Sequence, residues 1–174
     1  MYDYTPTQAR IAELYDFYRT ALMNAKYYGR KLQMLKRVAL VIDIATALAA
    51  SGAFAGLAVW KGDIGKNVFS LVLGLTAVLA AVRPVLQLPD KIGRCSKLSY
   101  GYMEVFYRIQ ILTAEIRAAG RVAPEHLQRV TDVMDRFRAL ELEGDAYQNP
   151  KRLLKYQDEV DVAIPVERLW LPSE

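Results

Sequence analysis

Two long uncharged segments, separated by a short polar turn at Lys61–Lys66, limit the folds open to this chain more than any other feature. No Asp, Glu, Lys or Arg occurs from Ile44 to Trp60, or from Asn67 to Val82. As a helix, each segment would be about 24–26 Å long. The apolar core of a bilayer is about 30 Å thick, and flanking Lys and Arg side chains can extend the usable length. The pattern predicts a two-helix transmembrane hairpin with spans at 38–60 and 66–88. A hairpin buried inside a soluble helical protein is the alternative.

The distribution of Lys and Arg predicts the orientation of this hairpin. No acid occurs from Met23 to Arg37, and cations follow the second span. These flanking cations are Lys26, Arg30, Lys31, Lys36, Arg37, Arg83, Lys91, Arg94 and Lys97. Because Lys and Arg favour the cytoplasmic side, both termini are expected in the cytoplasm and the turn outside.

The remaining sequence is typical of helices. Apolar residues recur at three- and four-residue intervals from Thr7 into the first span, from near Asp90 to Ala119, and from Pro124 to Gly144. The stripes expected to be buried in the last two helices are Ile92, Cys95, Leu98, Tyr102, Val105, Ile109, Leu112 and Ile116, and Leu127, Val130, Met134, Phe137 and Leu140. The sequence therefore predicts an all-α protein in which the transmembrane hairpin continues into a cytoplasmic bundle of long helices. Its parts are an N-terminal helix at 1–37, the hairpin at 38–88, cytoplasmic helices at 89–144 and a looser tail at 145–174 with one or two helical turns.

Asp43 is an acid within the first span. Positions 43 and 83 are equally distant from the middle of the turn, so Asp43 and Arg83 are expected at about the same depth on adjacent antiparallel helices. An ion pair that locks the hairpin is one interpretation. A ring of Asp43 carboxylates at the mouth of an oligomeric cation pore is another. A solvated interfacial acid is the third. The face of Asp43 also carries Thr46, Ala47, Ala50, Phe54 and Leu57, which would line a pore or form a packed seam.

Small side chains are abundant in both spans. Gly52 and Gly56 form a GxxxG pair, and a second small face runs beside it. Small residues allow helix backbones to approach closely in lipid, where burial of apolar surface gives no drive for association. A homo-oligomer is therefore expected. The predicted helix-packing residues are Ala45, Ala49, Gly52, Ala53, Gly56, Gly74, Ala77 and Ala81.

Catalytic and metal-binding patterns are missing from the sequence. Cys95 is the single cysteine and His126 the single histidine, so a zinc site has no support. His126 is expected to be solvated and Cys95 to pack on an apolar face. The turn GDIGKN lacks the spacing of a phosphate loop. We expect no enzyme, no cofactor and no nucleic-acid partner. Tyr27, Tyr28, Tyr100 and Tyr102 are expected at the inner membrane interface.

The basic and aromatic lead-in KYYGRKLQMLKR, the two-span hairpin, and the following helix KLSYGYMEVFYRIQILTAEI together resemble the SLATT family. The likeness covers about residues 5 to 160. It implies a two-transmembrane effector of the bacterial inner membrane, associated with nucleotide-second-messenger and SLOG-type sensor systems in phage defence. A separate sensor protein or a nucleotide second messenger would then be its trigger. The family has no signature catalytic residues, and no fused sensor or nuclease domain is expected in this chain.

Two functions follow as hypotheses. The first is an oligomeric pore or ion channel, gated through its cytoplasmic helices and acting as a defence effector. The second is a membrane anchor or scaffold that docks a partner through its bundle and its acidic tail, with Leu169-Trp170-Leu171 as an apolar hook. Packing of this tail on its own bundle is the alternative for the hook.

Overall fold

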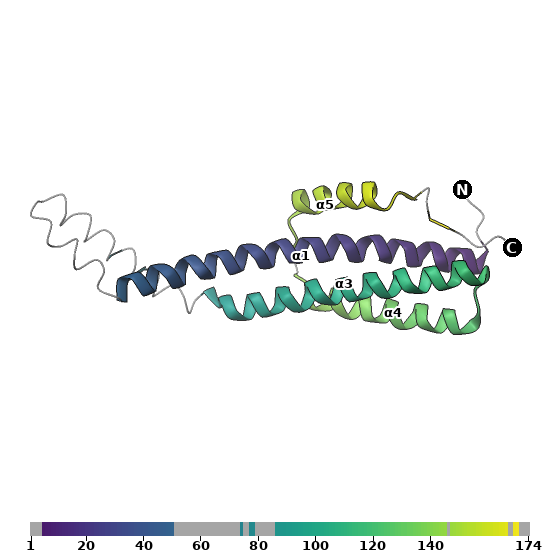
Figure 1. The fold of residues 1–174 in the computed structure, drawn as a ribbon, viewed down its shortest axis with the longest axis horizontal. Helices are drawn as coiled ribbons and strands as arrows, with labels where there is room; N and C mark the ends of the chain where they lie inside the picture. The colour runs from purple at the N-terminus through teal and green to yellow at the C-terminus, as the bar shows by residue number, and fades with distance from the viewer. Residues whose placement is uncertain are drawn as a thin grey trace, which may run out of the picture. The chain divides into compact units, whose positions relative to one another are not determined.

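The computed structural model describes residues 5–50, 74, 77–78, 86–145, 147–166 and 169–170 of the 174-residue chain. It is all-α: helices α1 (Pro6–Ala50), α3 (Leu88–Ala119), α4 (Pro124–Glu143) and α5 (Pro150–Ala163) follow one another, and these residues contain no strand (Figure 1). The prediction of an all-α fold is confirmed. The chain divides into two compact units, one formed by Met1–Arg30 with Cys95–Glu174 and the other by Lys31–Arg94.

Within the described residues, no helix combines the length and hydropathy that a membrane crossing requires. Most of the two spans expected at 38–60 and 66–88 lies outside those residues.

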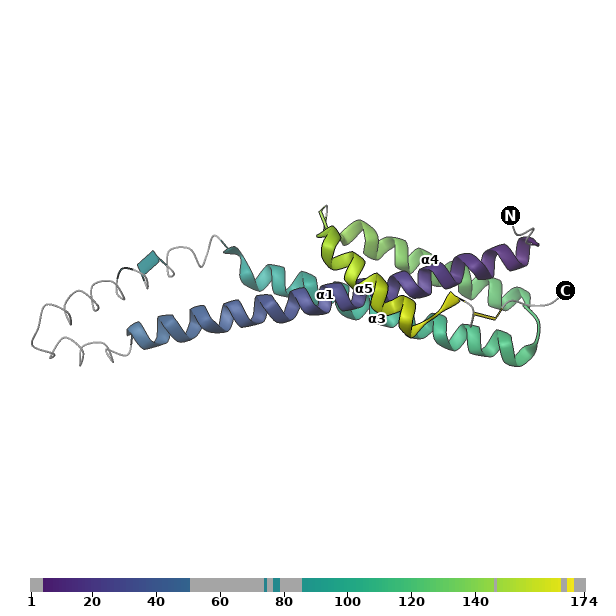
Figure 2. The same ribbon diagram turned by 90° about the horizontal axis from the view of Figure 1, so that it is seen from above.

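The first unit is a bundle in which α1, α3 and α4 share an aromatic core, and Figure 2 shows these helices from above. Tyr28 of α1 stacks on Tyr102 of α3 at a centroid distance of 5.9 Å. Tyr102 in turn meets Phe137 of α4 edge-on at 5.5 Å, and Phe137 contacts Phe17 of α1 at 4.7 Å. The three helices thus meet around one chain of rings, in which edge-to-face and stacked pairs add to the burial of apolar area.

Helical periodicity predicted most of this core. On α3 the expected stripe is buried at Cys95, Leu98, Tyr102, Val105, Ile109, Leu112 and Ile116, and only Ile92 is half-buried. On α4 the expected residues Val130, Met134, Phe137 and Leu140 are buried, whereas Leu127 is half-buried.

The ends of α3 and α4 follow from glycine and proline. After Ala119, the φ of Gly120 is +66°, a left-handed conformation that costs glycine little and ends the helix. Pro124 occupies the first turn of α4, where its missing N–H leaves no helical hydrogen bond unmade. At the other end of α4, a Cβ on Gly144 would lie only 2.9 Å from the Glu141 carbonyl oxygen. The predicted limits of both helices are confirmed.

Two expectations about the bundle were wrong. Three of the four tyrosines expected at a membrane interface, Tyr27, Tyr28 and Tyr102, are buried, because their rings fill the bundle; only Tyr100 is exposed. The tail also forms a longer helix than one or two turns, since α5 extends over 14 residues. The side chain of Asn149 caps it by accepting a hydrogen bond from the Arg152 N–H at 3.3 Å.

Candidate functional site

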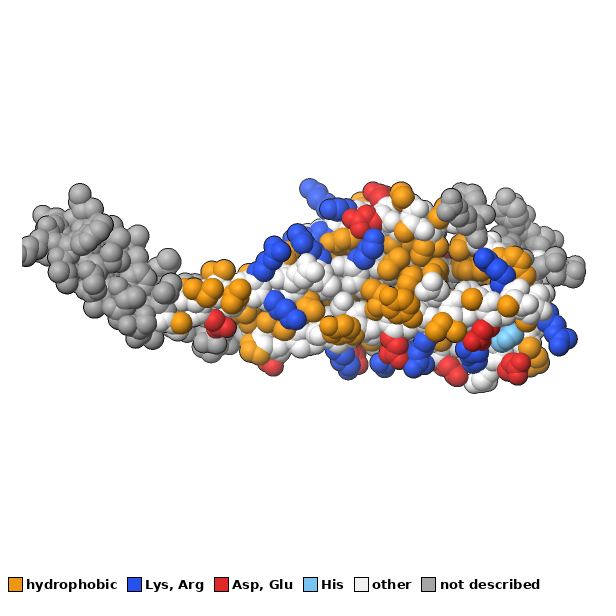
Figure 3. Space-filling view, in the orientation of Figure 1, with side chains coloured by type: hydrophobic (Ala, Val, Ile, Leu, Met, Phe, Trp, Pro, Cys, Tyr) orange, Lys and Arg blue, Asp and Glu red, His pale blue; other side chains and the backbone are white. Residues whose placement is uncertain are grey.

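The last described part of α1 changes from basic to apolar within a few residues. Lys36 and Arg37 are exposed, and four large apolar side chains that follow them are also exposed. Their exposed fractions are 46% for Val38, 58% for Leu40, 64% for Val41 and 50% for Ile44. At 100° per residue these four positions extend over nearly half of the helix circumference. Figure 3 shows the apolar side chains at this end of α1, with Lys and Arg side chains next along the helix.

Such a surface differs from the face that α1 presents to its bundle. There Ile11, Leu14, Ala21, Ala25 and Tyr28 are at most 3% exposed. A contiguous exposed apolar patch on a protein typically marks a surface that contacts a partner or a membrane. The end of α1 is therefore the leading candidate for a functional surface.

Three residues of the predicted pore face, Asp43, Thr46 and Ala47, belong to this end of α1, and Ala47 is exposed. Asp43 is exposed, between buried Ile42 and exposed Ile44. Thr46 is half-buried, and its hydroxyl donates to the Ile42 carbonyl oxygen at 2.8 Å, four residues back on the same helix. The other predicted members, Phe54, Leu57, Arg83 and the side chain of Ala50, lie outside the described residues. The pairing of Asp43 with Arg83 stays a prediction.

Few of the predicted helix-packing residues are described. Ala45 is half-buried, and Gly74 and Ala77 are helical and exposed. A Cβ on Gly74 would meet no described atom within 4 Å. The remaining positions, Gly52, Ala53, Gly56, Ala81 and the side chain of Ala49, lie outside the described residues.

A second feature belongs to the bundle: two tyrosines of α1 hold the connection between α4 and α5. The Tyr28 hydroxyl accepts hydrogen bonds from the Asp145 N–H at 3.0 Å and from the Gln148 side-chain amide at 3.1 Å. The neighbouring Tyr27 hydroxyl accepts one from the Asn149 N–H at 3.2 Å. This role of the two tyrosines was not predicted from the sequence. Adjacent tyrosines in the middle of a helical pattern were the available signal, but nothing in the pattern identifies a partner about 120 residues away.

Helix α5 lies along α1 and is held mainly by charge. Arg19 pairs with Asp161, and the Lys26 ammonium lies 2.9 Å from a Glu159 carboxylate oxygen. The hydrogen bond from Lys26 lowers the pKa of Glu159 below its usual value. Val160 is the one buried residue of α5. Exposed ion pairs contribute about 0–1 kcal/mol each, so α5 is weakly attached in comparison with α4.

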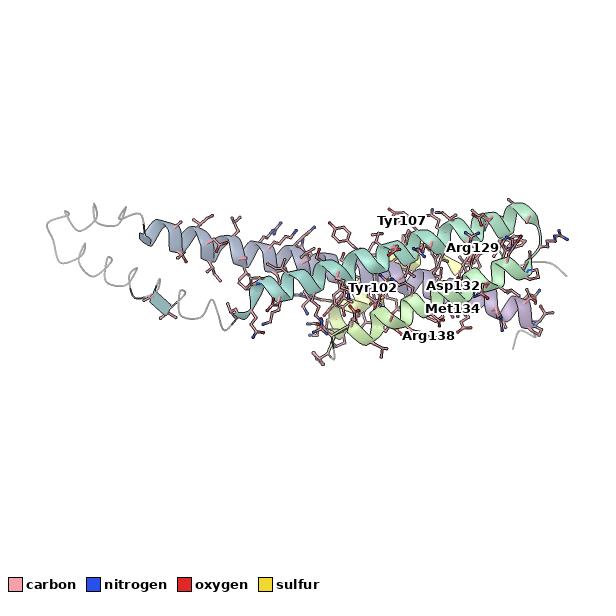
Figure 4. All side chains as sticks on the ribbon, turned by 90° about the horizontal axis from the view of Figure 1, so that it is seen from below. Tyr102, Tyr107, Arg129, Asp132, Met134 and Arg138 are labelled. Atoms are coloured by element: carbon pink, nitrogen blue, oxygen red, sulfur yellow. The ribbon has the colours of Figure 1, made fainter. Side chains whose placement is uncertain are left out.

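Small cavities lie between helices in the described part of the bundle. The first, of about 290 Å³, lies between α1 and α5 and is lined by Asp16, Arg19, Thr20, Met23, Gln157, Val160 and Asp161. The second, of about 270 Å³, lies between α3 and α4 and is lined by Arg108, Ile111, Leu112, Arg129, Asp132 and Val133. Figure 4 shows Arg129 and Asp132 side by side on α4. Both cavities are at or below the lower limit of usual ligand sites, and the arginines of the second already pair with Glu104 and Glu115.

The single histidine and the single cysteine both serve the fold. His126 is buried, which corrects the expectation that it is solvated, and its Nδ1 accepts a hydrogen bond from the Ala123 N–H at 3.2 Å. The imidazole thus satisfies a donor at the start of α4. Cys95 is buried on the apolar face of α3, as predicted. In the described part of the chain, no group of three or more His, Cys, Asp or Glu side chains is arranged to hold a metal ion.

The described end of the tail packs against its own bundle. Leu169 and Trp170 are half-buried, and the Tyr15 hydroxyl of α1 hydrogen bonds with the Trp170 backbone. Burial raises the pKa of Tyr15, and the nearby Arg117 guanidinium opposes that shift. These contacts favour the packed alternative over an apolar hook for Leu169 and Trp170. Leu171 lies outside the described residues.

Comparisons of the chain with protein-family models, curated proteins and solved structures find no match.

Proposed function

We propose that this chain is a membrane protein whose apolar hairpin assembles from several copies into a pore or ion channel, with the helical bundle on the cytoplasmic side. One observation carries the proposal: four large apolar side chains at the end of α1 are 46–64% exposed, directly after exposed cations. They begin the sequence that continues without charge from Ile44 to Trp60.

The energetics favour lipid as the surroundings of this segment. Full burial of a Val, Leu or Ile side chain is worth about 1.5–3 kcal/mol, so Val38, Leu40, Val41 and Ile44 together lose several kcal/mol when left in water. A bilayer removes all of them from water at once. Two helices joined by a short polar turn then satisfy every backbone group within the apolar core.

The charge pattern supports the orientation. The described start of α3 adds exposed Lys91, Arg94 and Lys97 to the cations that precede the first span. In the proposal, both termini and the bundle face the cytoplasm, and the membrane is a bacterial inner membrane, as the resemblance to the SLATT family implies. That resemblance supports a defence effector that is opened by a separate sensor protein or a nucleotide second messenger.

The small residues of the spans support assembly into an oligomer. Gly74 and Ala77 are exposed on a helical segment, and the first span carries Gly52 and Gly56 at GxxxG spacing. Close packing of such faces between copies is the usual way in which membrane helices associate. In the oligomer, Asp43 carboxylates at one depth would form an acidic ring that favours cations.

Ion flux from liposomes that contain the purified full chain tests the proposal. We expect flux above that of empty liposomes, with cations preferred over anions, and a reduced cation preference for Asp43→Asn. Asp158→Asn is the matched control, because it neutralises one exposed acid of the bundle. Unchanged selectivity of Asp43→Asn would exclude Asp43 from the pore. Recovery of the chain in the soluble fraction after detergent-free lysis would exclude the hairpin in the membrane.

A membrane anchor is the second candidate, and the outer face of α3 favours it. Tyr107 and Ile111 are each 55% exposed there, four residues apart on one helix face, which is suited to docking another protein. Stable membrane insertion without flux in planar bilayer recordings, together with a partner lost on Tyr107→Ser and Ile111→Ser, would decide for the anchor over the pore.

A further inference from the structure

We propose that the basic collar of this protein binds the headgroups of anionic phospholipids. The basic collar is defined as Lys31, Lys36 and Arg37 on α1 with Lys91 and Arg94 at the start of α3. The inference rests on the proposed membrane insertion and adds a class of lipid to it.

Positive charge predominates around the basic collar. In the described part of the unit Lys31–Arg94, these five cations are accompanied by two acids, Asp43 and Asp90. Along α1 no acid occurs between Asp16 and Asp43. Lys36, Arg37 and Lys91 are exposed. A field of one sign at a membrane surface attracts lipids of the opposite charge.

The position of the collar fits the headgroup layer. Arg37 immediately precedes Val38, and Ile44 lies about 10 Å further along the helix axis. The headgroup regions add roughly 5–7 Å to each side of the apolar core. With Val38 to Ile44 in the acyl region, Lys36 and Arg37 lie at the level of the phosphates, which their long side chains can reach.

The surface beside the collar selects a lipid over an acidic protein. An acidic protein surface would neutralise Lys36 and Arg37 but would leave Val38, Leu40 and Val41 in contact with a charged partner. A phospholipid matches both parts of this surface: its anionic phosphate lies beside the cations, and its apolar chains lie beside the apolar side chains that follow them. The arginine guanidinium can also bind a phosphate through two parallel hydrogen bonds.

Native mass spectrometry of the full chain in a neutral detergent tests the proposal. The protein is incubated with equimolar phosphatidylglycerol and phosphatidylcholine, and the ratio of the two retained lipids is measured. We expect phosphatidylglycerol to be preferred about tenfold, and the preference to weaken as salt rises from 50 to 500 mM. In the variant Lys36→Gln/Arg37→Gln/Lys91→Gln the ratio should approach one.

The matched control removes three exposed cations from the bundle, in Arg121→Gln/Lys151→Gln/Lys155→Gln, and should keep the preference. Equal retention of both lipids by the wild-type chain, or equal loss in both variants, would overturn the proposal. Displacement of phosphatidylglycerol by inorganic phosphate would identify a free-anion site instead. A collar-dependent complex with an acidic protein would assign the surface to that partner. All of these outcomes leave membrane insertion intact, so failure of the lipid site is distinguishable from failure of the proposed function.

Discussion

Gly93 and Gly101 occupy the same helix, α3, in opposite surroundings. A Cβ on Gly101 would lie 2.6 Å from Cδ2 of Leu140, which is itself 1% exposed, whereas a Cβ on Gly93 would meet no described atom within 4 Å. Gly93→Ala should raise the free energy of unfolding by about 0.5–1 kcal/mol through helix propensity. Gly101→Ala should lower the free energy of unfolding by about 1 kcal/mol, because the added methyl group overpacks against Leu140 and this cost exceeds the gain in helix propensity. Thermal unfolding followed by circular dichroism measures both, and equal effects would contradict the close packing of α3 on α4.

Tyr28 is predicted to stabilise the connection between α4 and α5 through its hydroxyl alone. Tyr28→Phe keeps the stacked ring but removes the acceptor for the Asp145 N–H and the Gln148 amide. The expected cost is about 1–2 kcal/mol. Hydrogen exchange at the Asp145 amide should accelerate accordingly. Tyr100→Phe is the control, since Tyr100 is 72% exposed, and its exchange and stability should match the wild type.

The buried tyrosines predict a loss of stability at high pH. Burial raises the pKa of Tyr102 above its ordinary value of 10.0, and nearby Tyr28 and Glu141 add to the shift. A raised folded-state pKa contributes stability that is complete below pH 10 and is lost as pH rises toward the folded-state value. Unfolding by urea should therefore require less denaturant as pH rises above about 10. In Tyr102→Phe, the urea concentration at the unfolding midpoint should fall less steeply with pH. A fall as steep as that of the wild type would contradict the role of Tyr102.

Among the helices, α5 is predicted to detach without unfolding the rest of the bundle. Its one buried side chain is Val160, and exposed ion pairs provide the other contacts with α1 described above. Val160→Asp places a charge against α1 and should release α5, a loss of about 2–3 kcal/mol in its docking free energy. Limited proteolysis near Lys151 to Lys155 should become faster. Val162→Asp is the control, because Val162 is 84% exposed; equal proteolysis of both variants would contradict the docking.

Helix existence and helix ends were predictable from local chemistry, whereas helix pairing was not. The 3.6-residue period placed the buried stripe of α3, and Gly120 with Pro124 placed the break before α4. These signals depend only on neighbours in sequence. The attachment of α5 was not predictable, because Arg19–Asp161 joins residues 142 positions apart and charge patterns do not specify which acid a cation meets. Tyrosine likewise has two roles, at membrane interfaces and in buried networks, and only the fold distinguishes them.

The candidate site was predictable to a smaller extent. The apolar sequence pattern located the end of α1, where Val38, Leu40, Val41 and Ile44 are exposed and Ile42 is buried. The roles of Asp43 and Thr46 depend on contacts between helices or between copies. The Thr46 hydroxyl, for example, donates to the Ile42 carbonyl oxygen of its own helix, a bond common to threonine in any helix. The sequence pattern therefore located the apolar end of α1 but did not predict the role of each side chain in it.

For the whole molecule, the proposed membrane orientation makes a topological prediction. If both termini are cytoplasmic, every exposed residue of the bundle faces the cytoplasm. Cys95 is the single cysteine and is buried, so Cys95→Ala provides a cysteine-free background at a cost of about 1 kcal/mol. In that background, Leu142→Cys on α4 and Val162→Cys on α5 introduce thiols at positions that are 89% and 84% exposed.

A membrane-impermeant maleimide should label both thiols in inverted membrane vesicles and neither in intact spheroplasts. Gly62→Cys, in the connecting turn, should show the opposite pattern, because the turn is predicted on the outer side. The three thiols form a matched set with one reagent and one background, so differences in labelling report sidedness. Labelling of Leu142→Cys in intact spheroplasts would reverse the orientation and place the basic collar on the outer surface. Labelling of all three thiols only after lysis would instead place the hairpin inside the cell, where the uncharged segments from Ile44 to Trp60 and from Asn67 to Val82 would have to be covered by protein in place of lipid.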